Sequence, residues 1–182
     1  MTNQVNQIRF TAQSSITIAV SPTGRGYRLA ATQFLPCARE QVFDFFSDAM
    51  NLQTLTPPWL RFTVLRPSRI HIAPGALIDY RLRVHGIPIR WQSCIDVWDP
   101  PFRFVDEETR GPYKRWHHEH VFEQAEGGTM CRDIVDYEVY GGKLINSLLV
   151  RPDLLKIFAF RQSKLRELFP ETGDSILRSA GV

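Results

Sequence analysis

Residues 111–123 read GPYKRWHHEHVFE. After the Gly-Pro pair, residues of similar character recur at every second position, which is typical of a β-strand rather than a helix. One face of this strand carries Trp116, His118, His120 and Phe122, and the other carries Arg115, His117, Glu119 and Glu123. A face that combines large aromatic rings with two imidazoles favours a partly polar pocket over a purely apolar core.

The strand belongs to a long series of similar runs without helical interruption. Short segments that contain Gly or Pro separate these runs. Consecutive strands joined by short turns predict an antiparallel meander. The expected strands are Phe62–Leu65, Ala76–Val84, Ile87–Val97, Phe102–Glu108, Lys114–Glu123 and Met130–Tyr140.

The residues before the meander predict one strand and two short helices. Tyr27–Leu35 is a strand-like run that ends before Pro36. Ala38–Asp48 places its apolar residues at helical spacing. Asn51–Leu55 continues as a second short helix and ends before a Thr-Pro-Pro sequence, which cannot extend it.

The meander is followed by a helical segment from about Lys143 to Phe169. Pro152 either breaks this segment near its first third or marks a helix start, because proline has no backbone N–H to donate. Beyond Pro152, apolar residues recur at three- and four-residue steps, with Arg161 embedded in the stripe. The element order predicts an α+β protein in which one long helix covers a sheet and leaves a cavity beneath it.

Composition divides the chain into three parts. Residues 1–26 are rich in Gln, Asn, Ser and Thr and form an N-terminal extension. Its run Ile16–Val20 is expected to add an edge strand, to pair across the edge of a homodimer, or to stay partly disordered. Residues 27–170 form the folded domain, and residues 171–182 form a loose tail. A monomer and a homodimer both remain open.

Charge and cysteine content narrow the class of protein. The net charge is +3 and the basic residues are scattered, so nucleic-acid binding is not indicated. The three cysteines are widely spaced, which argues against a disulfide framework and favours a reducing compartment. We find no apolar run long enough to cross a bilayer and no signal-peptide pattern, and therefore expect a cytoplasmic protein without stable membrane insertion.

Five local phrases, in this order, make the chain resemble a known superfamily. They are AREQVFDFFSD, GALIDYRL, WDPPFRFVDE, GPYKRWHHEHVFE and GGTMCRDIVDYEVY. Together with the element order, they resemble the START-like superfamily, also called SRPBCC, over residues 27–169. These helix-grip proteins include relatives of the birch-pollen allergen, polyketide cyclases and coenzyme Q-binding proteins. The resemblance implies a curved antiparallel sheet wrapped around a long C-terminal helix, with a deep and largely apolar pocket between them.

The two-residue period predicts which strand side chains face that pocket. They are Ile78, Tyr80 and Leu82; Ile89, Trp91 and Ser93; Phe104, Asp106 and Glu108; Trp116, His118 and His120; and Asp133, Val135 and Tyr137. A one-residue bulge would invert any of these sets. The residues expected to contact a ligand are Tyr80, Leu82, Trp91, Phe104, Asp106, Trp116, His118, His120, Asp133, Tyr137, Phe158 and Arg161.

The first functional hypothesis is a binder of a small, mainly hydrophobic molecule. Burial of apolar ligand surface would supply affinity, and a few polar groups would orient the ligand, with His118, His120, Asp106 and Tyr137 as first choices. A second hypothesis is a cyclase or dehydratase that uses those four residues and Glu108 as acid and base. A third is a chaperone that carries a lipid or a quinone to a membrane complex.

Metal binding and the role of Arg161 are separate questions. His118 and His120 present two imidazoles to one side, and Asp106, Glu108 or Asp133 can supply a carboxylate. This spacing is weakly specific and the resemblance implies no metal, so the sequence leads us to expect neither a metal nor another cofactor. Arg161 is expected to contact an anionic group of a ligand, to pair with Asp133 or Glu108, or to extend its charged end to solvent.

Overall fold

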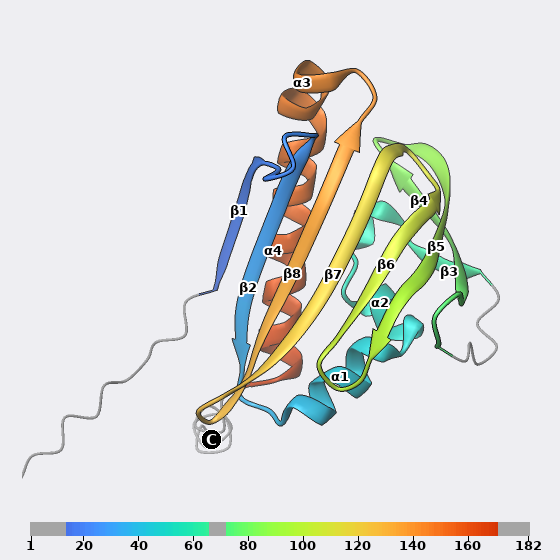
Figure 1. The fold of residues 1–182 in the computed structure, drawn as a ribbon. Helices are drawn as coiled ribbons and strands as arrows, with labels where there is room; N and C mark the ends of the chain where they lie inside the picture. The colour runs from blue at the N-terminus through green and yellow to red at the C-terminus, as the bar shows by residue number, and fades with distance from the viewer. Residues whose placement is uncertain (1–13, 66–71, 171–182) are drawn as a thin grey trace, which may run out of the picture.

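The computed structural model describes residues 14–65 and 72–170. One antiparallel sheet of eight strands curves around a long helix near the C-terminus (Figure 1). In sheet order the strands are β1 (Ser15–Val20), β2 (Tyr27–Leu35), β8 (Gly128–Val139), β7 (Tyr113–Ala125), β6 (Arg103–Arg110), β5 (Ile87–Asp99), β4 (Leu77–Val84) and β3 (Thr63–Leu65). The predicted α+β helix-grip architecture is confirmed.

Most of the sheet is the expected meander, in which β3 to β8 follow one another as hairpins. The exception is the pairing of β2 with β8, which runs from Tyr27 opposite Tyr137 to Leu35 opposite Thr129. This long-range pairing places the first long strand beside the last one. The run Ser15–Val20 forms the edge strand next to β2. Residues 1–13 of the predicted extension and the whole predicted tail lie outside the described residues.

The helices lie on one side of the sheet (Figure 1). They are α1 (Arg39–Ser47), α2 (Ala49–Thr54), a 3-10 turn at Pro58–Leu60, α3 (Gly142–Ile145), a π-helical turn at Asn146–Val150, and α4 (Arg151–Leu168). Among the described residues, we find no helix with both the length and the apolarity needed to cross a membrane.

Pro152 lies in the first turn of α4, directly after the π-helical turn. Proline cannot donate a backbone hydrogen bond, and its ring clashes with the carbonyl four residues earlier in a regular helix. A π-helical turn has wider spacing, with bonds between residues five apart. Helical structure therefore continues from Gly142 through Pro152 to Leu168, and the proline marks the start of α4 rather than a break.

Helix α4 packs against the β1–β2 side of the sheet. Leu154 and Phe158 belong to one core cluster with Leu29 and Val135. The Gln162 side chain donates a hydrogen bond to the Thr32 carbonyl at 3.2 Å, which ties α4 to β2. Because α4 is held over this half of the sheet, the space beside it falls over β4 to β7.

Helix α1 covers the other end of that space. Its residues Val42 and Phe43 are buried in a second core cluster with Phe104 and Phe122. The ring of Phe43 lies edge-on to Phe122, with centroids 5.6 Å apart. The two core clusters thus hold α4 and α1 against different parts of one sheet, and a cavity remains between them.

Candidate functional site

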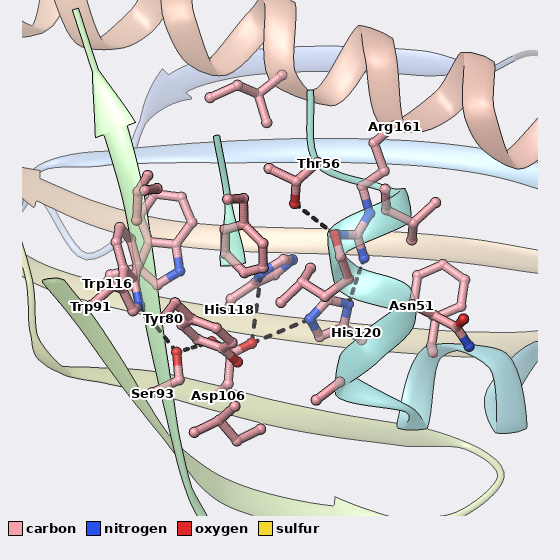
Figure 2. A pocket seen from close by; sticks show the side chains of 18 of the residues that line it. Asn51, Thr56, Tyr80, Trp91, Ser93, Asp106, Trp116, His118, His120 and Arg161 are labelled. Carbon is pink, nitrogen blue, oxygen red and sulfur yellow. Dashed lines mark hydrogen bonds and ion pairs between the residues drawn. The ribbon is translucent and has the colours of Figure 1, made fainter. Parts of the chain in front are cut away.

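A cavity of about 220 Å³ lies between the sheet and the helices (Figure 2). Strands β4 to β7, the α1–α2 segment and α4 each contribute to its wall. Most of the lining side chains are apolar or aromatic, and the acidic and basic members are Asp106, His118, His120 and Arg161. Aromatic contacts shape the wall, since Trp91 and Trp116 meet edge to face with ring centroids 5.3 Å apart.

The cavity wall contains most of the side chains that alternation placed on the inward face. Of the residues expected to contact a ligand, those in the wall are Tyr80, Leu82, Trp91, Phe104, Asp106, Trp116, His118, His120, Phe158 and Arg161. Ile78 and Ser93 also line the cavity, as their strand positions predict. Contact of any of them with a ligand stays a prediction.

Five positions expected in the wall do not line the cavity. They are Ile89, Glu108, Asp133, Val135 and Tyr137. Val135 and Tyr137 point inward but are completely buried in the core cluster with α4. The Tyr137 hydroxyl donates to Asn146 Oδ1 at 3.0 Å rather than facing a ligand space. These two positions lie in the core rather than in the cavity wall because α4 rests directly on this part of β8.

Glu108 and Asp133 do not line the cavity, for two different reasons. Glu108 lies near the β6–β7 turn, where its Oε1 accepts a hydrogen bond from the Tyr113 backbone N–H at 3.1 Å. Burial raises the pKa of Glu108 to about 7, and the Tyr113 hydrogen bond opposes that rise. Asp133 instead lies behind the two imidazoles, where it pairs with both rings.

The part of the wall that the α1–α2 segment forms was missing from the sequence-based set. Phe45, Phe46, Asn51, Leu52, Leu55 and Thr56 line the cavity from the α1–α2 segment. Phe45 and Phe46 are consecutive aromatic residues on an amphipathic helix. That pattern alone does not distinguish a residue in a cavity wall from one in a solid core.

Strand register brings the polar groups of the wall together. Asp106 on β6 is opposite His118 on β7, and His120 is opposite Asp133 on β8. His118 Nε2 lies 3.0 Å from Asp133 Oδ1, and His120 Nδ1 lies 2.8 Å from the same oxygen. On the other side of the rings, Asp106 Oδ2 lies 3.3 Å from His120 Nε2 and 3.7 Å from His118 Nδ1.

Two further residues hold the carboxylates of this cluster. Arg161 on α4 pairs with Asp133, its Nε lying 3.3 Å from Oδ2. On the other side, Ser93 Oγ donates to Asp106 Oδ1 at 3.1 Å. Trp91 Nε1 donates to Ser93 Oγ at 3.1 Å, so a chain of hydrogen bonds runs from the indole to Asp106 (Figure 2).

Burial and neighbouring charges separate the pKa values of the two histidines. Burial and the charge of His120 lower the pKa of His118 to about 4, although Asp133 opposes this shift. Burial also disfavours the charged form of His120, but hydrogen bonds with Asp106 and Asp133 raise its pKa above the ordinary value. His118 is therefore neutral near pH 7, and His120 is the ring that holds an extra proton more readily.

The carboxylates of the cluster are ionised. Burial alone would raise the pKa of Asp133, but Arg161 and the bonds from both histidines hold it well below its ordinary value. Burial opposes the charged form of Asp106 in the same way, and the His120 hydrogen bond and the imidazole charges lower its pKa. The site thus places two partly buried carboxylates on opposite sides of two imidazoles.

The eight-stranded sheet curved around a long C-terminal helix is the fold of a helix-grip protein of the START-like superfamily. Residues 35–152, more than half of the 182-residue chain, match the family model described as "Polyketide cyclase / dehydrase and lipid transport". The chain therefore belongs to this family. No curated protein matches the chain.

Solved structures with the same fold are distant in sequence. Protein Ms6760 from Mycobacterium smegmatis is 15% identical, with 85% of this chain and 97% of that chain covered and a TM-score of 0.61. Protein CV1439 from Chromobacterium violaceum is 12% identical, with coverage of 79% and 97% and a TM-score of 0.63. A protein from Arthrobacter aurescens is 13% identical, with coverage of 84% and 91% and a TM-score of 0.65. At these identities the likeness shows the fold alone.

Proposed function

We propose that this protein binds a small, mainly hydrophobic molecule in the cavity between β4–β7 and α4. The observation that carries the proposal is a largely apolar, aromatic wall with one convergent polar cluster, formed by Asp106, His118 and His120. Such a wall supplies affinity through burial of apolar ligand surface, while the polar groups select one ligand orientation.

The size of the cavity favours a compact ligand. Its volume of about 220 Å³ lies just below the range of roughly 300–1,000 Å³ that is common for small-molecule sites. The indole rings of Trp91 and Trp116 offer flat apolar surfaces to a ring-containing molecule. A compact cyclic compound suits this wall better than a long acyl chain does.

A matched pair of cavity variants tests the proposal. Leu82 and Ile89 face each other across β4 and β5, but only Leu82 lines the cavity. Leu82→Trp fills part of the cavity and is expected to weaken binding of an apolar fluorescent probe at least tenfold. Ile89→Trp adds the same ring outside the cavity and should change the affinity by less than about twofold. Titration of each variant with an anilinonaphthalene dye, monitored by the fluorescence of the dye, measures both affinities.

Extraction of the purified protein gives a second readout. Native mass spectrometry and organic extraction should find a hydrophobic compound with the wild type and with Ile89→Trp, and less of it with Leu82→Trp. A wild type that carries no compound and binds no apolar probe would overturn the proposal. Equal probe binding by both variants would place the binding outside this cavity. A lipid or a quinone in the extract would instead identify the carrier function.

Acid–base catalysis of the cyclase or dehydratase kind is the second candidate function. The observation that favours it is the His120–Asp106 contact in the cavity wall, 3.3 Å long, beside a second imidazole with a different proton affinity. Once a substrate is known, Asp106→Asn should abolish turnover while substrate binding survives. Loss of binding and turnover together would reject a catalytic role for Asp106.

A further inference from the structure

Three hydrogen-bond acceptors converge in the cavity wall. Asp106, His118 and His120 each present one atom, and these atoms all lie within 4.8 Å of one another. Asp106 Oδ2 is the shared neighbour, 3.3 Å from His120 Nε2 and 3.7 Å from His118 Nδ1. Strands β6 and β7 supply all three residues, so the sheet itself holds the arrangement.

Asp133 determines which imidazole nitrogens carry protons. An ionised carboxylate can only accept hydrogen bonds, and the Arg161 guanidinium keeps Asp133 ionised. The nitrogens that face it at 3.0 and 2.8 Å, His118 Nε2 and His120 Nδ1, are therefore the ones that donate to it, and the Arg161 guanidinium lies farther from His120 Nδ1, at 3.5 Å. In the neutral rings, the lone pairs of His118 Nδ1 and His120 Nε2 then both point toward the side of Asp106.

Direct contacts join these three residues only in part. His120 Nε2 lies 3.3 Å from Asp106 Oδ2, within hydrogen-bond distance. His118 Nδ1 remains 3.7 Å from Asp106 Oδ2 with its lone pair unused. One cation placed between the three atoms would bind all of them at once.

We propose that Asp106, His118 and His120 form a site for one divalent first-row transition-metal ion. Two imidazoles and one carboxylate suit zinc or iron(II), and they leave further coordination positions open. Ligand bonds of about 2.0–2.2 Å place neighbouring ligand atoms roughly 3.0–3.5 Å apart. The separations of 3.3 and 3.7 Å from Asp106 Oδ2 are close to that range, and all three ligand atoms lie within 4.8 Å of one another.

Residues behind the three ligands support the same assignment. In metal sites, a ligating imidazole usually donates its second N–H to a carboxylate, which fixes the ring and strengthens the ligand. Asp133 accepts from both rings in this way, and Arg161 holds Asp133. Ser93 donates to Asp106 Oδ1 and leaves Oδ2 for the ion. All three ligands thus have an ordered partner on the side away from the ion.

The site goes beyond the proposed binding of an apolar molecule. Asp106, His118 and His120 are part of the cavity wall, so the open coordination positions face the ligand space. A bound ion would attract an oxygen or nitrogen atom of the same molecule whose apolar part meets Trp91 and Trp116. The two proposals remain separable, because apolar binding can be measured on metal-free protein.

Metal titration of the metal-free full chain tests the site, with Co²⁺ as a spectroscopic probe and Zn²⁺ as a competitor. We expect about one Co²⁺ per chain, visible absorption bands of a coordinated ion, and displacement by Zn²⁺. Asp106→Asn and His118→Gln should weaken binding at least tenfold. Asp133→Asn should weaken it by about 10–100-fold, because it removes only the partner that orients the rings.

His117→Gln is the matched control. His117 is adjacent in sequence and also contacts a carboxylate, that of Glu107, but it lies on the opposite face of β7. Its loss should leave the Co²⁺ affinity and the absorption bands unchanged. Thermal unfolding without metal shows whether each variant is folded, and added Zn²⁺ should raise the midpoint of the wild type and of His117→Gln only.

The results of the metal titration can contradict the metal site without contradicting the proposed function. No Co²⁺ binding by folded wild type, or equal binding by folded Asp106→Asn and wild type, overturns the metal site. Loss of binding in His117→Gln points to a surface site and overturns it as well. If metal-free protein still binds the apolar probe in any of these cases, the proposed function stands and the metal inference alone fails.

Discussion

Two aspartate–arginine pairs on strand β8 lie on opposite faces of the sheet and have different surroundings. The inward pair joins Asp133 to Arg161 on α4, and their side chains are 13% and 8% exposed. The outward pair joins Asp136 to Arg28 on β2 at 2.5 Å, and the Arg28 side chain is 36% exposed. Water can solvate Arg28 if its partner is lost, but it cannot reach Arg161 in the same way. Asp136 itself is 7% exposed, so the two pairs differ in their arginines: Arg161 is buried with its partner, whereas Arg28 is partly open to water.

Loss of the inward carboxylate, that of Asp133, should lower the free energy of unfolding the most. Asp133→Ala leaves the Arg161 charge buried without its partner and removes the acceptor from both imidazoles. Breaking a buried pair in this way costs about 3–5 kcal/mol. Urea unfolding of metal-free protein at pH 7 measures the change in the free energy of unfolding.

The double variant Asp133→Ala/Arg161→Met is the control for this explanation. If the unpaired charge causes the loss, removal of Arg161 should restore part of the stability, so the double variant should be more stable than the sum of the two single effects predicts. Additive effects would show that the two residues act independently. That result would contradict the contrast between the two faces.

A change at Tyr137, where a helix packs on the inward face of β8, should lower the free energy of unfolding by an intermediate amount. Tyr137 is 1% exposed, and its hydroxyl donates to the buried Asn146 in the π-helical turn. Tyr137→Phe keeps the ring but leaves the Asn146 amide oxygen without this donor, which should cost about 1–3 kcal/mol.

Tyr137→Phe also distinguishes the part of this face that packs against a helix from the part that lines the cavity. Because Tyr137 does not line the cavity, Tyr137→Phe should leave the affinity for the apolar probe unchanged. Chemical denaturation and the fluorescence titration check the two expectations separately. A large loss of probe affinity with unchanged stability would place Tyr137 in the ligand space after all.

The smallest effect belongs to the outward pair and should depend on pH. The hydrogen bond from Arg28 is the main cause that lowers the pKa of Asp136 in the folded state. A lowered folded-state pKa adds stability above the unfolded pKa of about 4, and this stability is lost as pH falls through the folded-state pKa. Asp136→Asn should therefore cost about 0.2–1 kcal/mol at pH 7.

Unfolding experiments at pH 7, 5 and 3 test the direction in which the stability difference changes with pH. The difference between wild type and Asp136→Asn should be largest at pH 7 and should shrink below about pH 4, where the unfolded carboxyl is protonated. A difference that grows toward low pH would mean that Asp136 is not stabilised by Arg28. High salt should reduce the difference at pH 7, since the arginine is partly exposed.

Residue alternation was enough to predict most of the cavity wall on the strands. Tyr80, Trp91, Phe104, Trp116 and His118 all line the cavity from positions that the two-residue period assigned inward. Alternation works here because side chains on a strand point to opposite faces in turn. Register shifts in β5, between Gln92 and Ser93 and between Ile95 and Val97, did not move Trp91 or Ser93 out of the wall.

The errors on β8 arise from distance to the opposing layer, which no strand pattern contains. Val135 and Tyr137 face inward as predicted, yet α4 packs directly on them and leaves no space. The α1–α2 segment approaches the other half of the sheet and adds Phe46 and Leu52 to the wall. Period two identifies a face of a strand, but only the placement of a second layer decides whether that face is core or cavity wall.

By itself, the sequence determined the order of the strands and helices, the antiparallel meander and the face to which each strand side chain points. Each of these properties depends on residues that are near one another in the chain. Only the tertiary structure decided that Asp106 and Asp133 lie on opposite sides of two imidazoles, with Arg161 behind one of them. That arrangement requires the register of three strands and the position of α4, which are set by packing between distant parts of the chain.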